Sequence, residues 1–109
     1  RPAFSADGLV LAAGSSGDSG WIGSVLVWQR QGITSSFSGV APVKLYDPSG
    51  GLERSMGHGG PSLSANGLVL AAASFDDYGT GFSGGSVLVW QRSSLLDSFA
   101  DGAPVKLTD

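Results

Sequence analysis

The sequence contains no cysteine and only one histidine, His58, among its 109 residues. The lack of cysteine excludes disulfide bridges, cysteine-containing zinc sites and a cysteine nucleophile. A single histidine also excludes a metal site built from two histidines of one chain. Charged residues make up 14% of the chain, whereas about 25% is typical of soluble domains. The chain therefore has few of the side chains from which catalytic and metal sites are built.

Long apolar runs and clusters of basic residues are also missing. The longest apolar runs, such as residues 9–13 and 87–90, are far shorter than the roughly 20 residues that cross a bilayer. The net charge is −3, and the few Lys and Arg residues are scattered. We therefore expect neither membrane insertion nor nucleic-acid binding. The chain opens at Arg1-Pro2 without an initiator methionine, as expected of a processed product or a fragment.

Glycine is abundant, at 18 residues, and the chain repeats itself. Three blocks recur in the same order: Gly8-Leu-Val-Leu-Ala-Ala13 at 67–72, Gly23-Ser-Val-Leu-Val-Trp-Gln-Arg30 at 85–92, and Ala41-Pro-Val-Lys-Leu45 at 103–107. The offset is 59 for the first block and 62 for the other two, so the length change falls in a Gly-rich stretch, as in a loop on a fixed scaffold. The predicted organisation is a first repeat at 1–47, a Gly-rich connector at 48–60 and a second repeat at 61–109.

Each repeat has the pattern of four short strands, because apolar residues alternate over short runs that end at Gly, Asp, Asn, Ser or Pro. The predicted strands are 2–5, 9–14, 24–30 and 43–46, and their copies 61–64, 68–73, 86–92 and 105–108. Asp7-Gly8 and Asn66-Gly67 are strong signals for a hairpin turn. No segment shows a sustained helical period. The predicted class is all-β, with two four-stranded antiparallel repeats.

The third strand of each repeat is apolar on both faces. Its valines point to one face, while Leu26 and Trp28, and their copies Leu88 and Trp90, point to the other. We expect these four residues to pack in the core or between units. A sheet with two apolar faces must be covered twice, as in a blade of a β-propeller or a rung of an open array. Because a propeller usually takes roughly 4 to 8 blades, we expect the chain to associate with copies of itself or with adjacent repeats.

Two stretches also carry a resemblance to a known family. They are Phe4-Ser-Ala-Asp-Gly-Leu-Val-Leu-Ala-Ala-Gly14 with Gly23-Ser-Val-Leu-Val-Trp28, and Leu63-Ser-Ala-Asn-Gly-Leu-Val-Leu-Ala-Ala72 with Gly85-Ser-Val-Leu-Val-Trp90. They resemble the FG-GAP repeats of integrin-like β-propellers, in the bacterial-type variant. The resemblance implies propeller blades. Family members of the integrin kind bind calcium between the first two strands through several Asp or Asn oxygens. Here that loop holds one carboxylate, so we expect a tight turn there and no cofactor.

Aromatic and acidic side chains gather in the two long loops. A four-stranded meander places these loops and the connector at one end of the repeats. The candidate ligand-binding residues at this end are Asp18, Trp21, Asp76, Asp77, Tyr78 and Phe82. Aromatic rings beside carboxylates are typical of sugar recognition. The alternative is that the rings pack on the sheet or on a neighbouring unit, and that the two adjacent aspartates form a solvated turn.

No catalytic constellation is evident. Gly17-Asp18-Ser19-Gly20 is similar to a serine-protease motif, but the lone histidine lies on another loop and nothing positions it as a base. We therefore predict a non-catalytic, extracellular or cell-surface module, structural or adhesive, that assembles as a closed propeller or a filament. The alternative is a lectin-like propeller, formed by several two-blade chains, that binds glycans. The two long loops differ, which counts against two equal sugar sites.

Overall fold

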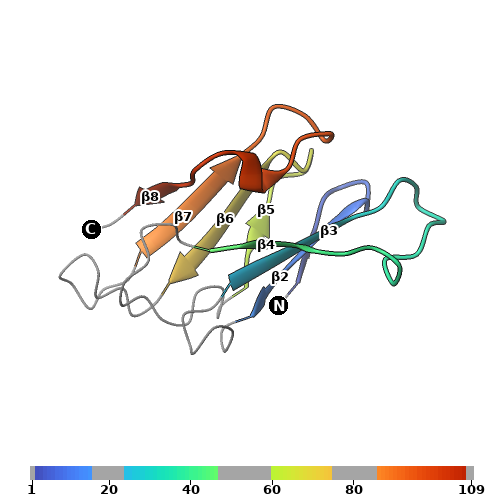
Figure 1. The fold of residues 1–109 in the computed structure, drawn as a ribbon, viewed down its shortest axis with the longest axis horizontal. Coiled ribbons are helices and arrows are strands. Elements are labelled where there is room, and N and C mark those ends of the chain that lie inside the picture. The colour runs from blue at the N-terminus through green and yellow to red at the C-terminus, as the bar shows by residue number, and fades with distance from the viewer. Residues whose placement is uncertain (1, 16–23, 47–59, 75–85, 108–109) are drawn as a thin grey trace.

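The computed structural model of the chain describes residues 2–15, 24–46, 60–74 and 86–107. Within them, eight strands form two four-stranded antiparallel sheets, each in the order of the chain (Figure 1). The first sheet consists of β1 (Ala3–Phe4), β2 (Val10–Ser15), β3 (Ser24–Gln29) and β4 (Val43–Leu45). The second sheet consists of β5 (Ser62–Leu63), β6 (Val69–Ser74), β7 (Ser86–Gln91) and β8 (Val105–Leu107). The predicted all-β class with two blade-like repeats is confirmed.

The first hairpin of each sheet turns on a glycine in the left-handed region. Gly8 has φ +74° and Gly67 has φ +76°, values that glycine adopts without the steric cost of a Cβ. The Asp7 carboxylate fixes the first of these turns. Its Oδ1 accepts hydrogen bonds from the Ser5 hydroxyl at 2.7 Å and from the Leu9 amide at 3.0 Å. The predicted tight turn is therefore present, and its aspartate binds within the turn itself.

The edge strands of both sheets are short, and each one directly follows a proline. Edge strands β1 and β5 have two residues, β4 and β8 have three, and the central strands have six. The four prolines that precede them are Pro2, Pro61, Pro42 and Pro104. Proline lacks the N–H that a strand interior needs, so it is tolerated beside an edge strand. Most of the side chains on each sheet face therefore come from its two central strands.

Each sheet has two apolar faces, which follow from the residues that lie opposite one another. Leu11 pairs with Trp28, whereas Ala12 pairs with Val27. We define the tryptophan face as Phe4, Leu11, Ala13, Leu26 and Trp28 in the first sheet, and Leu63, Leu70, Ala72, Leu88 and Trp90 in the second. We define the valine face as Val10, Ala12, Val25, Val27, Val43 and Leu45 in the first sheet, and Val69, Ala71, Val87, Val89, Val105 and Leu107 in the second.

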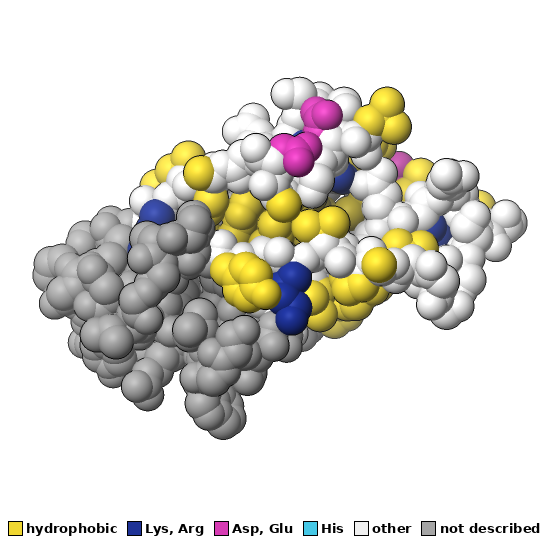
Figure 2. All heavy atoms as spheres, viewed as in Figure 1, with side chains coloured by type: hydrophobic (Ala, Val, Ile, Leu, Met, Phe, Trp, Pro, Cys, Tyr) yellow, Lys and Arg dark blue, Asp and Glu magenta, His cyan; other side chains and the backbone are white. Residues whose placement is uncertain are grey.

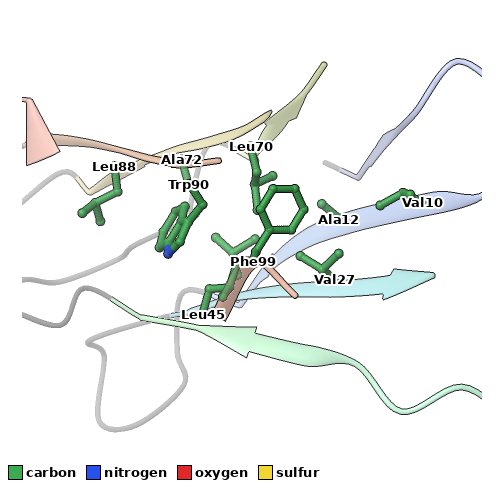
Figure 3. Close-up of a cluster of buried hydrophobic side chains, with 10 residues drawn as sticks. Val10, Ala12, Val27, Leu45, Leu70, Ala72, Leu88, Trp90 and Phe99 are labelled. Atoms are coloured by element: carbon green, nitrogen blue, oxygen red, sulfur yellow. The ribbon is translucent and has the colours of Figure 1, made fainter. Parts of the chain in front are cut away.

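The two sheets pack together through unlike faces. The valine face of the first sheet covers the tryptophan face of the second, and the ring of Phe99, from the short 3-10 helix η2 (Phe99–Asp101), lies between them (Figure 3). The buried core, in which no side chain is more than 4% exposed, consists of Val10, Ala12, Val25, Val27, Leu45, Leu70, Ala72, Leu88, Trp90 and Phe99. The core therefore lies between the sheets and uses one face of each.

Candidate assembly interface

Polar contacts fix the alignment of the two sheets at one end of their contact. The Gln29 side chain bridges the sheets, because its amide nitrogen donates to the Leu95 carbonyl at 2.8 Å and its oxygen accepts from Arg92 Nη1 at 2.9 Å. A backbone bond from the Ala6 N–H to the Ala65 carbonyl, at 2.8 Å, joins the two hairpin turns. Hydrogen bonds of this kind add geometric specificity to a contact that apolar burial stabilises.

Arg92 holds three segments of the second repeat together. Its Nε donates to the Gly67 carbonyl and its Nη1 to the Asp97 carbonyl, both at 3.0 Å, and its guanidinium lies 4.3 Å from the centroid of the Phe99 ring. Burial lowers the pKa of Arg92, and the charge of Asp97 acts in the opposite direction. The guanidinium keeps its proton, because arginine side chains are not deprotonated in proteins. We call this arrangement of arginine, turn carbonyl, loop carbonyl and phenylalanine ring the arginine clip.

The first repeat has the same arginine clip on its outer side. Arg30 donates through Nε to the Gly8 carbonyl and through Nη1 to the Ser35 carbonyl, both at 3.0 Å. Its guanidinium lies 4.5 Å from the centroid of the Phe37 ring, which in turn lies 6.3 Å from the Phe4 ring. Phe37 is only half-buried, whereas its copy Phe99 is 2% exposed. The same local structure thus occurs once between the sheets and once at the surface.

Both outer faces of the pair of sheets are apolar. On the tryptophan face of the first sheet, Phe4 is 55% exposed, and Leu26 and Trp28 are half-buried. On the valine face of the second sheet, Val105 is 61% exposed and Leu107 is 53% exposed. Several exposed apolar side chains on one face are typical of an interaction site.

The seam between the two sheets contains two cavities. One, of about 230 Å³, is lined by apolar side chains of both repeats, among them Val27 and Leu95. The other, of about 310 Å³, lies beside Tyr46, Trp90 and Asp101. Hydrophobic atoms run as a band across the centre of the view in Figure 2, between segments with polar surfaces. The seam therefore combines apolar side chains with a few polar ones, such as Gln29 and Arg92 in the first cavity and Lys44 and Asp101 in the second.

The described part of the chain was searched for metal-binding groups and for membrane-spanning helices. Among residues 2–15, 24–46, 60–74 and 86–107, no group of three or more His, Cys, Asp or Glu side chains is placed to hold a metal ion. In the same part of the chain, no helix is long and apolar enough to cross a membrane.

The predicted site residues fall into two groups. The predicted packing residues Leu88 and Trp90 are buried between the sheets, whereas Leu26 and Trp28 lie half-buried on the outer tryptophan face. The candidate ligand-binding residues all lie outside the described residues: Asp18, Trp21, Asp76, Asp77, Tyr78 and Phe82. Asp47 and residues 48–59, which form all but the last residue of the predicted connector, lie outside them as well.

The polar part of the interface was not predicted from the sequence. Gln29 and Arg30, and their copies Gln91 and Arg92, end the longest repeated block, but no role was predicted for them. The signal was available, because a Gln-Arg pair twice follows an apolar strand of identical sequence. Comparison with known proteins adds no further residue: no protein family, curated protein or solved structure matches the chain.

Proposed function

We propose that this chain is a non-catalytic extracellular module, structural or adhesive, that works by stacking its sheets with copies of itself or with further repeats. The observation that supports the proposal is the apolar surface on both outer faces, where Val105 and Phe4 are more than half exposed. Burial of apolar surface stabilises a contact by about 25 cal/mol per Å². Exposure of these apolar side chains to water is therefore unfavourable, and a neighbouring sheet packed on each outer face would bury them.

The low charge of the chain and its FG-GAP-like pattern agree with this role. With charged residues at 14%, little electrostatic repulsion opposes the approach of two faces. Blade-like sheets that stack in a circle close a propeller, and those that stack without closing form a filament. Either assembly satisfies the proposal.

The native mass of the protein tests this function. We expect light scattering over a range of concentrations to give a mass well above the 11.0 kDa of one chain, and electron micrographs of the same sample to show rings or fibres. A mass of one chain at every concentration contradicts the proposal. A glycan array with the same material distinguishes the stacking module from the lectin alternative. Retention on a glycan would indicate a sugar-binding site, which stacking alone does not require.

A further inference from the structure

The two outer faces are copies of the two faces already packed together inside the chain. Each buried core residue has a repeat partner on an outer face that is more exposed. Val25 is 0% exposed and its copy Val87 is 38% exposed, while Leu45 is 2% exposed and its copy Leu107 is 53% exposed. In the other direction, Trp90 is 2% exposed and its copy Trp28 is half-buried.

We propose that a second copy of this chain docks head to tail. The valine face of one chain's second sheet then covers the tryptophan face of the other chain's first sheet, by the same contact that joins the two sheets within a chain. This inference rests on the proposed assembly function and specifies its geometry. The contact is heterologous, since the two surfaces that meet are different, and a complex of two chains keeps one free tryptophan face on one chain and one free valine face on the other.

Space for the second copy is present at the hairpin turn of the first sheet. A Cβ on Gly67 would lie 3.2 Å from Val10 Cγ2 of the first sheet and 3.3 Å from Leu95 Cδ2. A Cβ on the equivalent Gly8 would lie 3.2 Å from Ile33 Cδ1, the counterpart of Leu95. The position that Val10 occupies beside Gly67 is thus the position that Val69 of a second copy would occupy beside Gly8.

Polar groups for the same bridging contact are also in place. Gln91, the copy of the bridging Gln29, is exposed at the end of the outer valine face. If the internal contact is repeated, its amide nitrogen donates to the Ile33 carbonyl of the second copy, and its oxygen accepts from Arg30. In the same way, the Ala65 N–H would donate to the Ala6 carbonyl of the second copy, just as the Ala6 N–H donates to the Ala65 carbonyl within the chain.

Shape and charge favour this contact over a symmetric one. The tryptophan face carries the large rings of Trp28 and Phe4, whereas the outer valine face carries smaller side chains such as Val87. Large side chains against small ones give the close packing seen in protein interiors. Two tryptophan faces would instead bring the charged Lys44 side chains, which lie opposite Leu26 on this face, toward each other.

The direction of docking is tested with two variants, each of which blocks one of the two faces. Trp28→Lys blocks the tryptophan face of the first sheet, and Val87→Lys blocks the valine face of the second. We expect each variant alone to have the mass of one chain. We expect their equimolar mixture to form a complex of two chains, because each variant supplies the face that the other lacks. Circular dichroism and thermal melting check that each variant is folded.

A charge-matched control and a second pair of variants complete the experiment. Thr34→Lys should assemble like the wild type, since its counterpart Leu96 stays 97% exposed beside the internal contact. Phe4→Lys and Val105→Lys repeat the test at positions that tolerate a polar side chain because they are more than half exposed. Gln91→Ala should weaken docking about ten-fold, the typical effect of losing hydrogen bonds to a charged group.

The outcomes that contradict the inference differ from those that contradict the function. If a single blocked variant still forms a two-chain complex, or if the mixture stays at the mass of one chain while the wild type assembles, the head-to-tail contact is wrong and the assembly function stands. If the wild type itself has the mass of one chain at every concentration, the proposed assembly function is wrong, and the head-to-tail contact is wrong as well.

Discussion

Asp7 and Asn66 occupy the same place in the two hairpin turns but differ in charge. Asn66 Oδ1 accepts from the Ser64 hydroxyl at 2.8 Å and from the Leu68 amide at 3.1 Å, which are the same contacts that Asp7 makes. The hydrogen bond from Ser5 is the main reason why the pKa of Asp7 lies below its ordinary value, with a further contribution from the Leu9 amide. The turn needs an oxygen at this position, and either side chain supplies it.

The charge of Asp7 predicts a small acid sensitivity that Asp7→Asn removes. A carboxylate whose pKa is lower in the folded chain stabilises the fold above its unfolded pKa of about 3.9, and this stabilisation is lost as the pH falls through the folded value. The free energy of unfolding, measured by urea denaturation, should therefore fall more steeply for the wild type than for Asp7→Asn as the pH is lowered from about 5 to about 2. The matched variant Asn66→Asp should make the slope steeper. Equal slopes for all three proteins would show that the turn does not stabilise the carboxylate.

Strands β3 and β7 have the same sequence, Ser-Val-Leu-Val-Trp-Gln, but opposite faces of them are buried. In β3 the valines face the core, and in β7 Leu88 and Trp90 do so. Local sequence cannot cause this difference, because it is identical in the two strands. The position of each sheet in the stack decides which face is covered.

This asymmetry predicts unequal effects for the same substitution at equivalent positions. Leu70 is 0% exposed in the core, whereas its copy Leu11 is half-buried on the outer face. Leu70→Ala should destabilise a single chain by about 2–5 kcal/mol, the usual range for a buried leucine, and Leu11→Ala should destabilise it by less. Urea denaturation at a concentration too low for assembly gives both values. Similar losses for the two variants would contradict the assignment of inner and outer faces.

The strands could be predicted closely from the sequence because their apolar alternation is regular and their turns contain Asp-Gly or Asn-Gly. The first strand of each repeat was predicted too long, at 2–5 and 61–64, where the structure has two residues. The reason is the serine that follows, since Ser5 Oγ accepts from the Val10 amide and donates to Asp7, which ends the ladder. The interface could not be predicted, because two nearly identical repeats offer the same faces and only their packing distinguishes the buried one.

In our proposal the whole molecule joins its neighbours mainly through apolar side chains and without an ion pair between chains, and this predicts how salt acts on the assembly. Salt screens interactions between exposed charges but does not weaken apolar burial. Raising the NaCl concentration from about 50 mM to about 1 M should therefore leave the mass of the assembly unchanged or increase it. Sulfate should increase it further. Dissociation to single chains at high salt would show that charged groups hold the assembly together. The Trp28→Lys variant, measured in the same buffers, controls for nonspecific salting out.

The proline-led edge strands determine the direction in which such an assembly can grow. Amyloid fibres lengthen by adding strands along the hydrogen-bonding direction, which requires a long unpaired edge. Here every edge strand has two or three residues and begins directly after a proline. In the proposed assembly, neighbours would therefore be added across the sheets, and the backbone ladders of the described strands would be completed within each chain. We therefore expect the proposed assembly to separate and rejoin without unfolding of its chains.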